Sequence, residues 1–258
     1  MERQFPLAED ARFGVVHHRA LNGRETLESA LPAVAELPGY VHIAEGDLCW
    51  SGATGETILY FHHPDYLVDT RKPGDVERAR EEGSLWTLED ALDEKFEDLL
   101  FVVEIKMGSG DRAAAIRKAV QLLERKRPGR YWIDTFSLRD ARMVKAASPR
   151  AAVSLHVKVC TGGWLLKTAL EFPPVSLRRP ANLRDVDVVT LTYKTSLQRL
   201  APWTGVALPK TADLLAASGK YLLLGGVASR RMFGEVKGSG ARAGYIKFPW
   251  RELLTETP

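Results

Sequence analysis

The sequence predicts an α/β protein folded as a single (β/α)8 TIM barrel. Strand and helix patterns alternate from one end of the chain to the other, as expected for a largely parallel sheet with helices between its strands. A short strand at 57–61 is set aside as an excursion. Eight strand candidates then remain, near residues 15, 43, 102, 133, 154, 189, 223 and 246. Eight strands and their helices in 258 residues match the size of such a barrel.

A doubly wound sheet is the alternative fold. It is less favoured because no glycine-rich motif of the dinucleotide-binding or P-loop type follows a strand.

The first half of the chain contains several strand patterns and one helix that begins with a capping motif. The helix pattern at 26–37 has Pro32 inside it, which predicts a kink. Thr87 and Asp90 stand at capping-box distance at the start of the next helix. The expected strands are 13–17, 40–48, 57–61 and 98–108; the expected helices are 26–37, 86–92 and 111–126, with a charged loop or surface helix at 71–83.

The second half repeats the alternation with shorter elements. Apolar periodicity predicts helices at 138–147, 208–217 and 231–236, a short helix from Ser196, and a closing helical turn at 250–255. The expected strands are 131–136, 152–157, 186–192, 221–227 and 243–248.

Composition bounds the class of protein. The formal net charge is only +3, and no lysine and arginine run of nucleic-acid-binding type or basic stripe with aromatic residues appears, so we expect no nucleic-acid partner. No apolar run approaches the roughly 18 residues of a membrane span, and the N-terminus has no signal-peptide core. Cys49 and Cys160 lie far apart and are expected to be reduced. These features predict a cytoplasmic protein without a transmembrane segment, and they leave its oligomeric state open.

The strand at 98–108 changes character near its end. Five apolar residues precede Glu104 and Lys106, which stand two apart and therefore project from the same face of the strand. A buried strand carries charges only when they have partners, because desolvating a lone ion costs several kcal/mol. A purely structural alternative is that Glu104 and Lys106 form an ion pair with each other where the strand reaches solvent.

Other expected strands also end in polar residues, and in a barrel these ends share one mouth. Glu45 and Asp47 end the second strand, so they would meet Glu104 there. Three converging carboxylates repel unless a cation joins them, and an all-oxygen set suits Mg2+ or Ca2+. The remaining polar strand ends are His17-His18-Arg19, His62-His63, Asp134, His156 with Lys158, and Tyr193-Lys194.

Two histidines from separate strands, His18 and His63, could flank a substrate as general acid and base. Arg19 and Lys106 add positive charge that suits a phosphate. A divalent cation, two histidines and two basic side chains together indicate phosphoester chemistry.

The order of these motifs resembles the glycerophosphodiester phosphodiesterase family of the phospholipase-C-like phosphodiesterase superfamily. The resemblance extends from about residue 13 to 250. It is carried by His18-Arg19-Ala20, Arg24-Glu25-Thr26-Leu27, Glu45-Gly46-Asp47, His63, Thr87-Leu88-Glu89-Asp90, Glu104-Ile105-Lys106 and the closing segment 240–249. It identifies His18 rather than His17, and His63 rather than His62, as the catalytic histidines.

The resemblance implies one phosphodiesterase-like TIM-barrel domain over residues 1–258 and a metal-dependent cleavage of a phosphodiester. One histidine would deprotonate a neighbouring substrate hydroxyl, and the other would protonate the leaving group. Glu45, Asp47 and Glu104 would hold Mg2+ or Ca2+, and Arg19 with Lys106 would contact the phosphate. The substrate would be a glycerophosphodiester or another small or lipid-derived phosphodiester.

The sequence departs from the family pattern at several positions. Ala20 stands in place of a glycine, Pro64 follows His63 in place of an aspartate, and Lys247-Phe248 replaces the closing Thr-Asp. The string 99–108 also resembles sphingomyelinase D, a relative on the same barrel. A sphingomyelinase-D-like enzyme, an enzyme for an unusual sugar or opine phosphodiester, and an impaired barrel that binds a phosphorylated ligand are therefore alternatives.

Overall fold

A computed structural model provides the fold. It describes residues 5–8, 10–52, 56–63, 73–93, 96, 98–157, 183–192 and 208–254. The expected helix from Ser196 lies outside the described residues, as do Cys160 and the polar strand-end residues Lys158, Tyr193 and Lys194.

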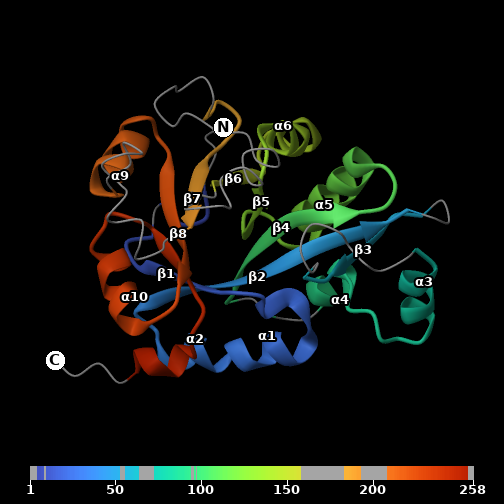
Figure 1. Cartoon of the computed structure of the whole chain (residues 1–258), viewed down its shortest axis with the longest axis horizontal. Helices are drawn as coiled ribbons and strands as arrows, with labels where there is room; N and C mark the ends of the chain where they lie inside the picture. The colour runs from blue at the N-terminus through green and yellow to red at the C-terminus, as the bar shows by residue number, and fades with distance from the viewer. Residues whose placement is uncertain are drawn as a thin grey trace, which may run out of the picture.

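Eight parallel strands close into a barrel, as the sequence predicts. In the nine-stranded sheet the order is β1-β9-β8-β7-β6-β5-β4-β2-β3, and pairing of β1 with β2 closes the ring. Figure 1 shows the helices around the outside of these strands, with α5 and α6 on one side and α9 and α10 on the other. The strands are β1 Phe13–His17, β2 Tyr40–Ser51, β3 Ile58–Phe61, β4 Leu100–Gly108, β5 Tyr131–Thr135, β6 Ala152–Val157, β7 Val188–Thr192, β8 Tyr221–Val227 and β9 Ala243–Ile246.

The excursion strand β3 lies outside the ring. It pairs antiparallel with the far end of β2, where Leu48 is opposite Phe61 and Ser51 is opposite Ile58. β2 therefore runs to Ser51, three residues beyond the expected end at Leu48. This extension carries β3 and the histidines that follow it to the carboxyl end of the barrel.

The helices follow the expected pattern with one correction. The expected single helix at 26–37 is two short helices, because Pro32 occupies the first position of the second. The Thr87–Asp90 capping box is present, since Asp90 N–H donates to Thr87 Oγ1 over 3.1 Å. The described helices are α1 Arg24–Ala30, α2 Pro32–Glu36, α3 Pro73–Glu81, α4 Leu88–Asp93, α5 Arg112–Lys126, α6 Leu138–Ala147, α9 Leu208–Ala217 and α10 Arg230–Lys237, with 3-10 turns η1 Ala20–Asn22 and η3 Trp250–Leu253.

The barrel has two apolar layers, one inside the ring of strands and one between the strands and the surrounding helices. Alternate residues of each strand face inward, so Val102 belongs to the inner cluster while Phe101 and Val103 pack under the helices. Trp132 fills the interior at full burial. Because inward positions repeat every two residues, Val102, Glu104 and Lys106 succeed one another along one inner row towards the mouth.

His17 faces the helical layer and forms a buried pair with His42 of β2. The two rings stack with centroids 5.4 Å apart, and His17 Nε2 lies 3.1 Å from His42 Nδ1. His42 Nε2 is 3.0 Å from the carbonyl oxygen of Leu37, which can only accept a hydrogen. His42 Nδ1 is therefore the acceptor for His17 Nε2–H, and both imidazoles are neutral. The pair stabilises the fold and lies away from the barrel interior.

This pair predicts acid-sensitive stability. Burial, followed by the neighbouring His42, lowers the pKa of His17 to about 3. Below the ordinary pKa of 6.5 the unfolded chain binds a proton that the folded chain refuses, so stability falls as the pH drops from 6.5 towards 3. At pH 5 we expect a loss of about 2 kcal/mol for this group, at ~1.4 kcal/mol per pKa unit. Urea unfolding of wild type and His17→Gln at pH 5 and pH 8, in metal-free buffer, measures it; an equal pH dependence in both proteins contradicts the assignment.

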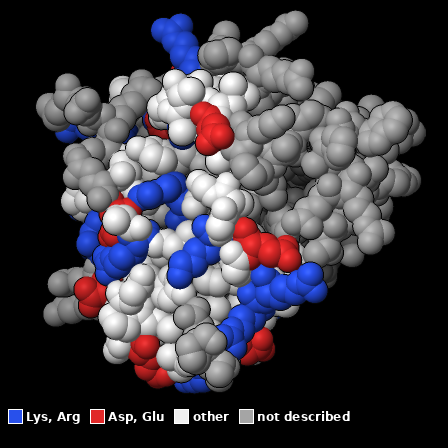
Figure 2. Space-filling view, turned by 90° about the vertical axis from the view of Figure 1, so that its left-hand side faces the viewer, with Lys and Arg blue, Asp and Glu red and all other residues white. Residues whose placement is uncertain are grey.

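The described surface carries charges of both signs. Figure 2 shows one face on which acidic side chains lie among basic ones. Exposed pairs such as Arg231 with Glu235, at 3.3 Å, are typical of the described surface. No helix among the described residues combines the length and apolar character that crossing a membrane requires.

Candidate active site

The carboxyl ends of β1, β2 and β4 and the residues after β3 bring the seven predicted site residues to one mouth of the barrel. Of these, Glu45, Asp47 and Glu104 are buried, and one oxygen from each lies within 4.8 Å of the others. Asp47 is directly opposite Glu104 in the pairing of β2 with β4. The structure thus places the three carboxylates together; their role as metal ligands stays a prediction.

Gly46 separates the two carboxylates of β2 and faces the opposite side of that strand. A Cβ atom there would lie 2.5 Å from Leu21 Cβ and 2.8 Å from the Phe61 ring, closer than atoms can approach. Glycine therefore allows η1 and β3 to pack directly on β2. This packing holds both neighbouring segments against the strand that carries Glu45 and Asp47.

The turn after β1 directs two groups at these carboxylates. Arg19 adopts a left-handed backbone conformation with φ of 62°, which is uncommon for a residue other than glycine. In that conformation its backbone N–H donates to Glu45 Oε2 over 2.7 Å. Arg19 Nε lies 3.5 Å from Asp47 Oδ2. Ala20, where the family has glycine, is buried and needs no unusual backbone angle.

Asn22 is a site residue that the sequence did not reveal. Its side-chain amide donates to Asp47 Oδ2 over 2.9 Å, and its Oδ1 accepts the backbone N–H of Asp47 over 2.8 Å. The two bonds fix both the strand and the orientation of the carboxylate. No pattern in the sequence connects an asparagine in a 3-10 turn with a strand 25 residues later, so this contact appears only in the folded structure.

Lys106 bridges two of the carboxylates. Its Nζ is 2.8 Å from Asp47 Oδ1 and also pairs with Glu104 Oε1. The ammonium lies 5.0 Å from the centre of the Phe136 ring, which covers it. Burial opposes ionisation of Asp47, but Lys106 and then the Asn22 amide outweigh it, so the pKa of Asp47 is lowered. Lys106 therefore supplies one positive charge inside the cluster.

Glu45 shows that one lysine does not balance this cluster. Its Oε1 is buried without a hydrogen-bond partner among the described residues. Burial, then repulsion from Asp47, raises the pKa of Glu45 to about 8. Three ionised carboxylates beside the positive charges of Lys106 and Arg19 still leave one negative charge uncompensated, so the cluster can accept a cation. The all-oxygen donor set and the partnerless Glu45 Oε1 therefore fit Mg2+ or Ca2+.

His18 occupies the inner row of β1, two residues beyond the inward-facing Val16. Burial, followed by the positive charges of Lys247, Arg19 and Lys106, lowers its pKa to about 3, while Asp47 opposes the shift. These are the charges that surround it at the mouth. An imidazole held neutral is suited to accept a proton, although added negative charge from a bound phosphate would raise its pKa.

His63 reaches the same mouth from β3. The backbone N–H of His62 donates to the carbonyl oxygen of Asp47 over 2.9 Å and so continues the pairing of β3 with β2. His63 is one of the groups whose charge lowers the pKa of Asp47. β1 and β3 both pair with the edge of β2 that faces away from β4, so His18 and His63 follow two segments on the same side of Asp47's strand. Their acid and base roles stay predictions.

A second polar group lies beside the first and was not assigned a role from the sequence. His156 Nδ1 is 3.2 Å from Asp134 Oδ2 and 3.9 Å from Glu104 Oε2. Asp134 is fully buried and also accepts from Ser154 Oγ and, at 3.4 Å, from Tyr245 OH. Asp134 and His156 stood out as polar strand ends, but only the barrel register places Asp134 opposite Glu104.

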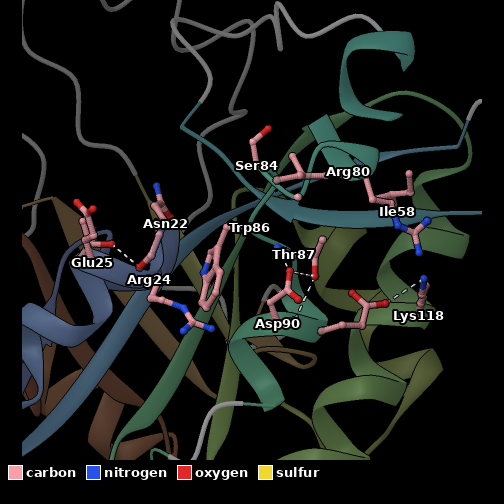
Figure 3. A pocket seen from close by; sticks show the side chains of 15 residues that line it. Asn22, Arg24, Glu25, Ile58, Arg80, Ser84, Trp86, Thr87, Asp90 and Lys118 are labelled. Atoms are coloured by element: carbon pink, nitrogen blue, oxygen red, sulfur yellow. Dashed lines mark hydrogen bonds and ion pairs between the residues drawn. The ribbon is translucent and has the colours of Figure 1, made fainter. Parts of the chain in front are cut away.

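A cavity of about 890 Å3 opens beside Asn22, between η1, α1 and the start of α4. Figure 3 shows Trp86 in its wall with Arg24 next to it, and Arg24 stacks on that ring at 5.6 Å. Most side chains that line the cavity are polar or charged, and its large apolar side chains are Ile58, Leu85 and Trp86. The lining is Asn22, Gly23, Arg24, Glu25, Thr26, Ile58, Arg80, Gly83, Ser84, Leu85, Trp86, Thr87, Glu89, Asp90 and Lys118.

Fold and site together define a (β/α)8 barrel with a carboxylate and histidine cluster at its mouth. No family model matches the sequence, and no curated protein matches it. Among solved structures, the chain is similar to an Oleispira antarctica phosphodiesterase in complex with the product sn-glycerol-3-phosphate, at 16% identity and TM-score 0.64, covering 97% of this chain and 99% of that one.

Two further solved structures have a similar fold. A glycerophosphodiester phosphodiesterase from Parabacteroides distasonis has 15% identity and TM-score 0.61, with 95% of this chain and 97% of that one covered. A candidate glycerophosphoryl diester phosphodiesterase from Silicibacter pomeroyi has 12% identity and TM-score 0.67, with 97% of each chain covered. The chain therefore has the fold of the glycerophosphodiester phosphodiesterases, which are phosphoric diester hydrolases.

Proposed function

We propose that the protein is a metal-dependent phosphodiesterase that cleaves a glycerophosphodiester or a related small phosphodiester. The observation that carries the proposal is the buried set Glu45, Asp47 and Glu104, which converges at the mouth with Lys106 and leaves Glu45 Oε1 without a hydrogen-bond partner among the described residues. His18 and His63 flank this set. The likeness in fold to phosphoric diester hydrolases supports the proposal.

Glu45, Asp47 and Glu104 would hold the ion, and Mg2+ or Ca2+ suits their oxygen atoms. When bound, such an ion lowers the charge on a phosphate oxygen and so favours attack at phosphorus. Asn22 and the Arg19 backbone N–H hold the carboxylates in place before any ligand arrives. The guanidinium of Arg19 and the ammonium of Lys106 would stabilise negative charge that develops on the phosphate.

His18 and His63 would transfer the protons. One takes the proton from a neighbouring hydroxyl of the substrate, whose oxygen then attacks phosphorus, and the other gives a proton to the departing alkoxide. Water opens the resulting cyclic phosphate with the two roles exchanged. The two imidazoles follow separate segments, β1 and β3, so each can act on its own oxygen of the substrate.

None of the seven predicted site residues lines the cavity, but Asn22 connects it to Asp47, so a polar substituent that extends from the phosphate could reach it. Most of its lining side chains can form hydrogen bonds, and Trp86 offers one flat apolar surface. A glycerol or other sugar-alcohol group fits this chemistry better than a long acyl chain does. A sphingomyelinase-D-like activity on a lipid would instead require an apolar surface elsewhere on the protein.

The direct test is an assay of the purified protein on glycerophosphocholine and on a lysophospholipid, with and without EDTA. We expect release of glycerol phosphate that EDTA abolishes and that Mg2+, Ca2+ or Mn2+ restores. Activity that persists under chelation would contradict the metal-dependent proposal. No turnover combined with tight binding of glycerol phosphate would instead support the impaired, ligand-binding alternative.

The pKa of Glu45 makes ion binding dependent on pH. Because this pKa is about 8 in the metal-free protein, a cation must displace the proton at pH 7. We expect the apparent association constant to rise about tenfold per pH unit below pH 8 and then to level off. Calorimetry in buffers of different ionisation enthalpy should record nearly one proton released per ion at pH 7. The variant Glu45→Gln should bind more weakly and without this proton release.

A further inference from the structure

We propose that the barrel mouth contains a second cation site, formed by Glu104, Asp134 and His156, which shares Glu104 with the first site. The inference rests on the proposed function, because the first site is the one that the phosphodiesterase would use. The second site would hold a neighbouring ion on a different set of ligand atoms, which includes an imidazole nitrogen.

The three side chains already converge on one point. One ligand atom from each lies within 4.8 Å of the other two. The shortest separations, 3.2 Å from His156 Nδ1 to Asp134 Oδ2 and 3.9 Å to Glu104 Oε2, are close to those between neighbouring ligands on one ion with bonds of about 2.1 Å. Asp134 is fully buried and Glu104 is only 4% exposed. Little rearrangement would therefore be needed to admit an ion.

Glu104 stands between the two groups. Its Oε1 pairs with Lys106, which in turn contacts Asp47, whereas its Oε2 faces His156. One carboxylate can therefore offer one oxygen to each site. Shared ligands of this kind hold two ions about 3.5–4 Å apart in many phosphoester-cleaving enzymes.

Asp134 also accepts hydrogen bonds of the kind that orient metal ligands in proteins. Ser154 Oγ donates to Asp134 Oδ1 and lies 2.9 Å from Thr190 Oγ1, so this oxygen is held in place. Tyr245 is buried, and its OH donates to Asp134 Oδ2 at 3.4 Å. Such second contacts orient a ligating carboxylate. The Phe136 ring stacks against His156 at 5.1 Å and restricts the imidazole.

The ligand set indicates which ion would bind. Two carboxylates and an imidazole suit Mn2+, Fe2+ or Zn2+ better than Mg2+ or Ca2+, which prefer oxygen alone. Mn2+ binds to both kinds of set and is paramagnetic, so it is the probe of choice. A plain hydrogen bond from His156 Nδ1–H to Asp134, without an ion, is the alternative arrangement.

The experiment counts Mn2+ ions on the full-length protein by equilibrium dialysis with elemental analysis, and records its electron paramagnetic resonance spectrum. We expect two ions per chain and the spectrum of a magnetically coupled pair. His156→Gln and Asp134→Asn should each retain one ion with an uncoupled spectrum, and Asp47→Asn should retain the other. The exposed carboxylate variant Asp93→Asn is the matched control and should keep two ions.

The possible outcomes separate the two proposals. One ion in wild type, unaffected by His156→Gln but lost in Asp47→Asn, overturns the second site and leaves the first intact. No ion in wild type overturns both. Circular dichroism and thermal melting identify any variant that fails to fold, and the coupled spectrum of wild type tests the proposal without any substitution.

Discussion

Replacing His63 by glutamine is expected to lower kcat by roughly 10²–10⁴-fold, the usual contribution of a general acid or base. The reason is its position beside Asp47 at the mouth, where an imidazole can exchange a proton with the substrate. The same loss is expected for His18→Gln. Steady-state kinetics on glycerophosphocholine, with the metal held at saturation, measures both.

His62→Gln is the matched control, because it replaces the adjacent imidazole and leaves the His62 backbone N–H bonded to Asp47. It should retain near-wild-type kcat. A loss in His62→Gln equal to that in His63→Gln would reverse the choice between the two residues.

A substrate with a better leaving group assigns the two roles. A 4-nitrophenyl ester of glycerol phosphate retains the attacking hydroxyl, but its leaving group departs without protonation. The histidine that acts as the acid should therefore be needed far less for this ester, whereas the base should be needed equally. Equal losses on both substrates in both variants would contradict a division into acid and base.

Asp47→Asn should have the second large effect, since Asp47 links three parts of the site. It contacts Lys106, Arg19 and Asn22 and is one of the three carboxylates proposed to hold the ion. We expect kcat/KM to fall by about three orders of magnitude, because an ion contributes several kcal/mol at ~1.4 kcal/mol per tenfold. Calorimetric titration with Mg2+ should show the corresponding loss of ion binding.

Lys106→Met separates ion binding from simple charge neutralisation by the lysine. If the carboxylates hold an ion, this variant should still bind Mg2+ while its turnover falls through loss of the phosphate contact. If Asp47→Asn in the presence of EDTA were as active as wild type, Lys106 alone would be enough to neutralise the carboxylates, and no ion would be needed. The exposed variant Asp93→Asn again serves as the control.

The barrel and much of its mouth were predictable from the sequence. The alternation of elements predicted eight parallel strands, and the structure closes them into a ring. The period of two within strands placed Glu45 with Asp47, and Glu104 with Lys106, on shared faces. Because parallel strands end at the same rim, polar residues at successive strand ends could be expected to meet even though they are distant in sequence.

How those residues are held, and which others join them, depends on contacts that form only when the chain folds. The two bonds between Asn22 and Asp47, the left-handed turn at Arg19 and the position of Asp134 opposite Glu104 depend on register and packing between elements. Local sequence carries no signal for such contacts, because their partners are set by how strands align and by which side chains fit between them. The charge imbalance at Glu45 likewise exists only after burial, since desolvation is a property of the folded chain.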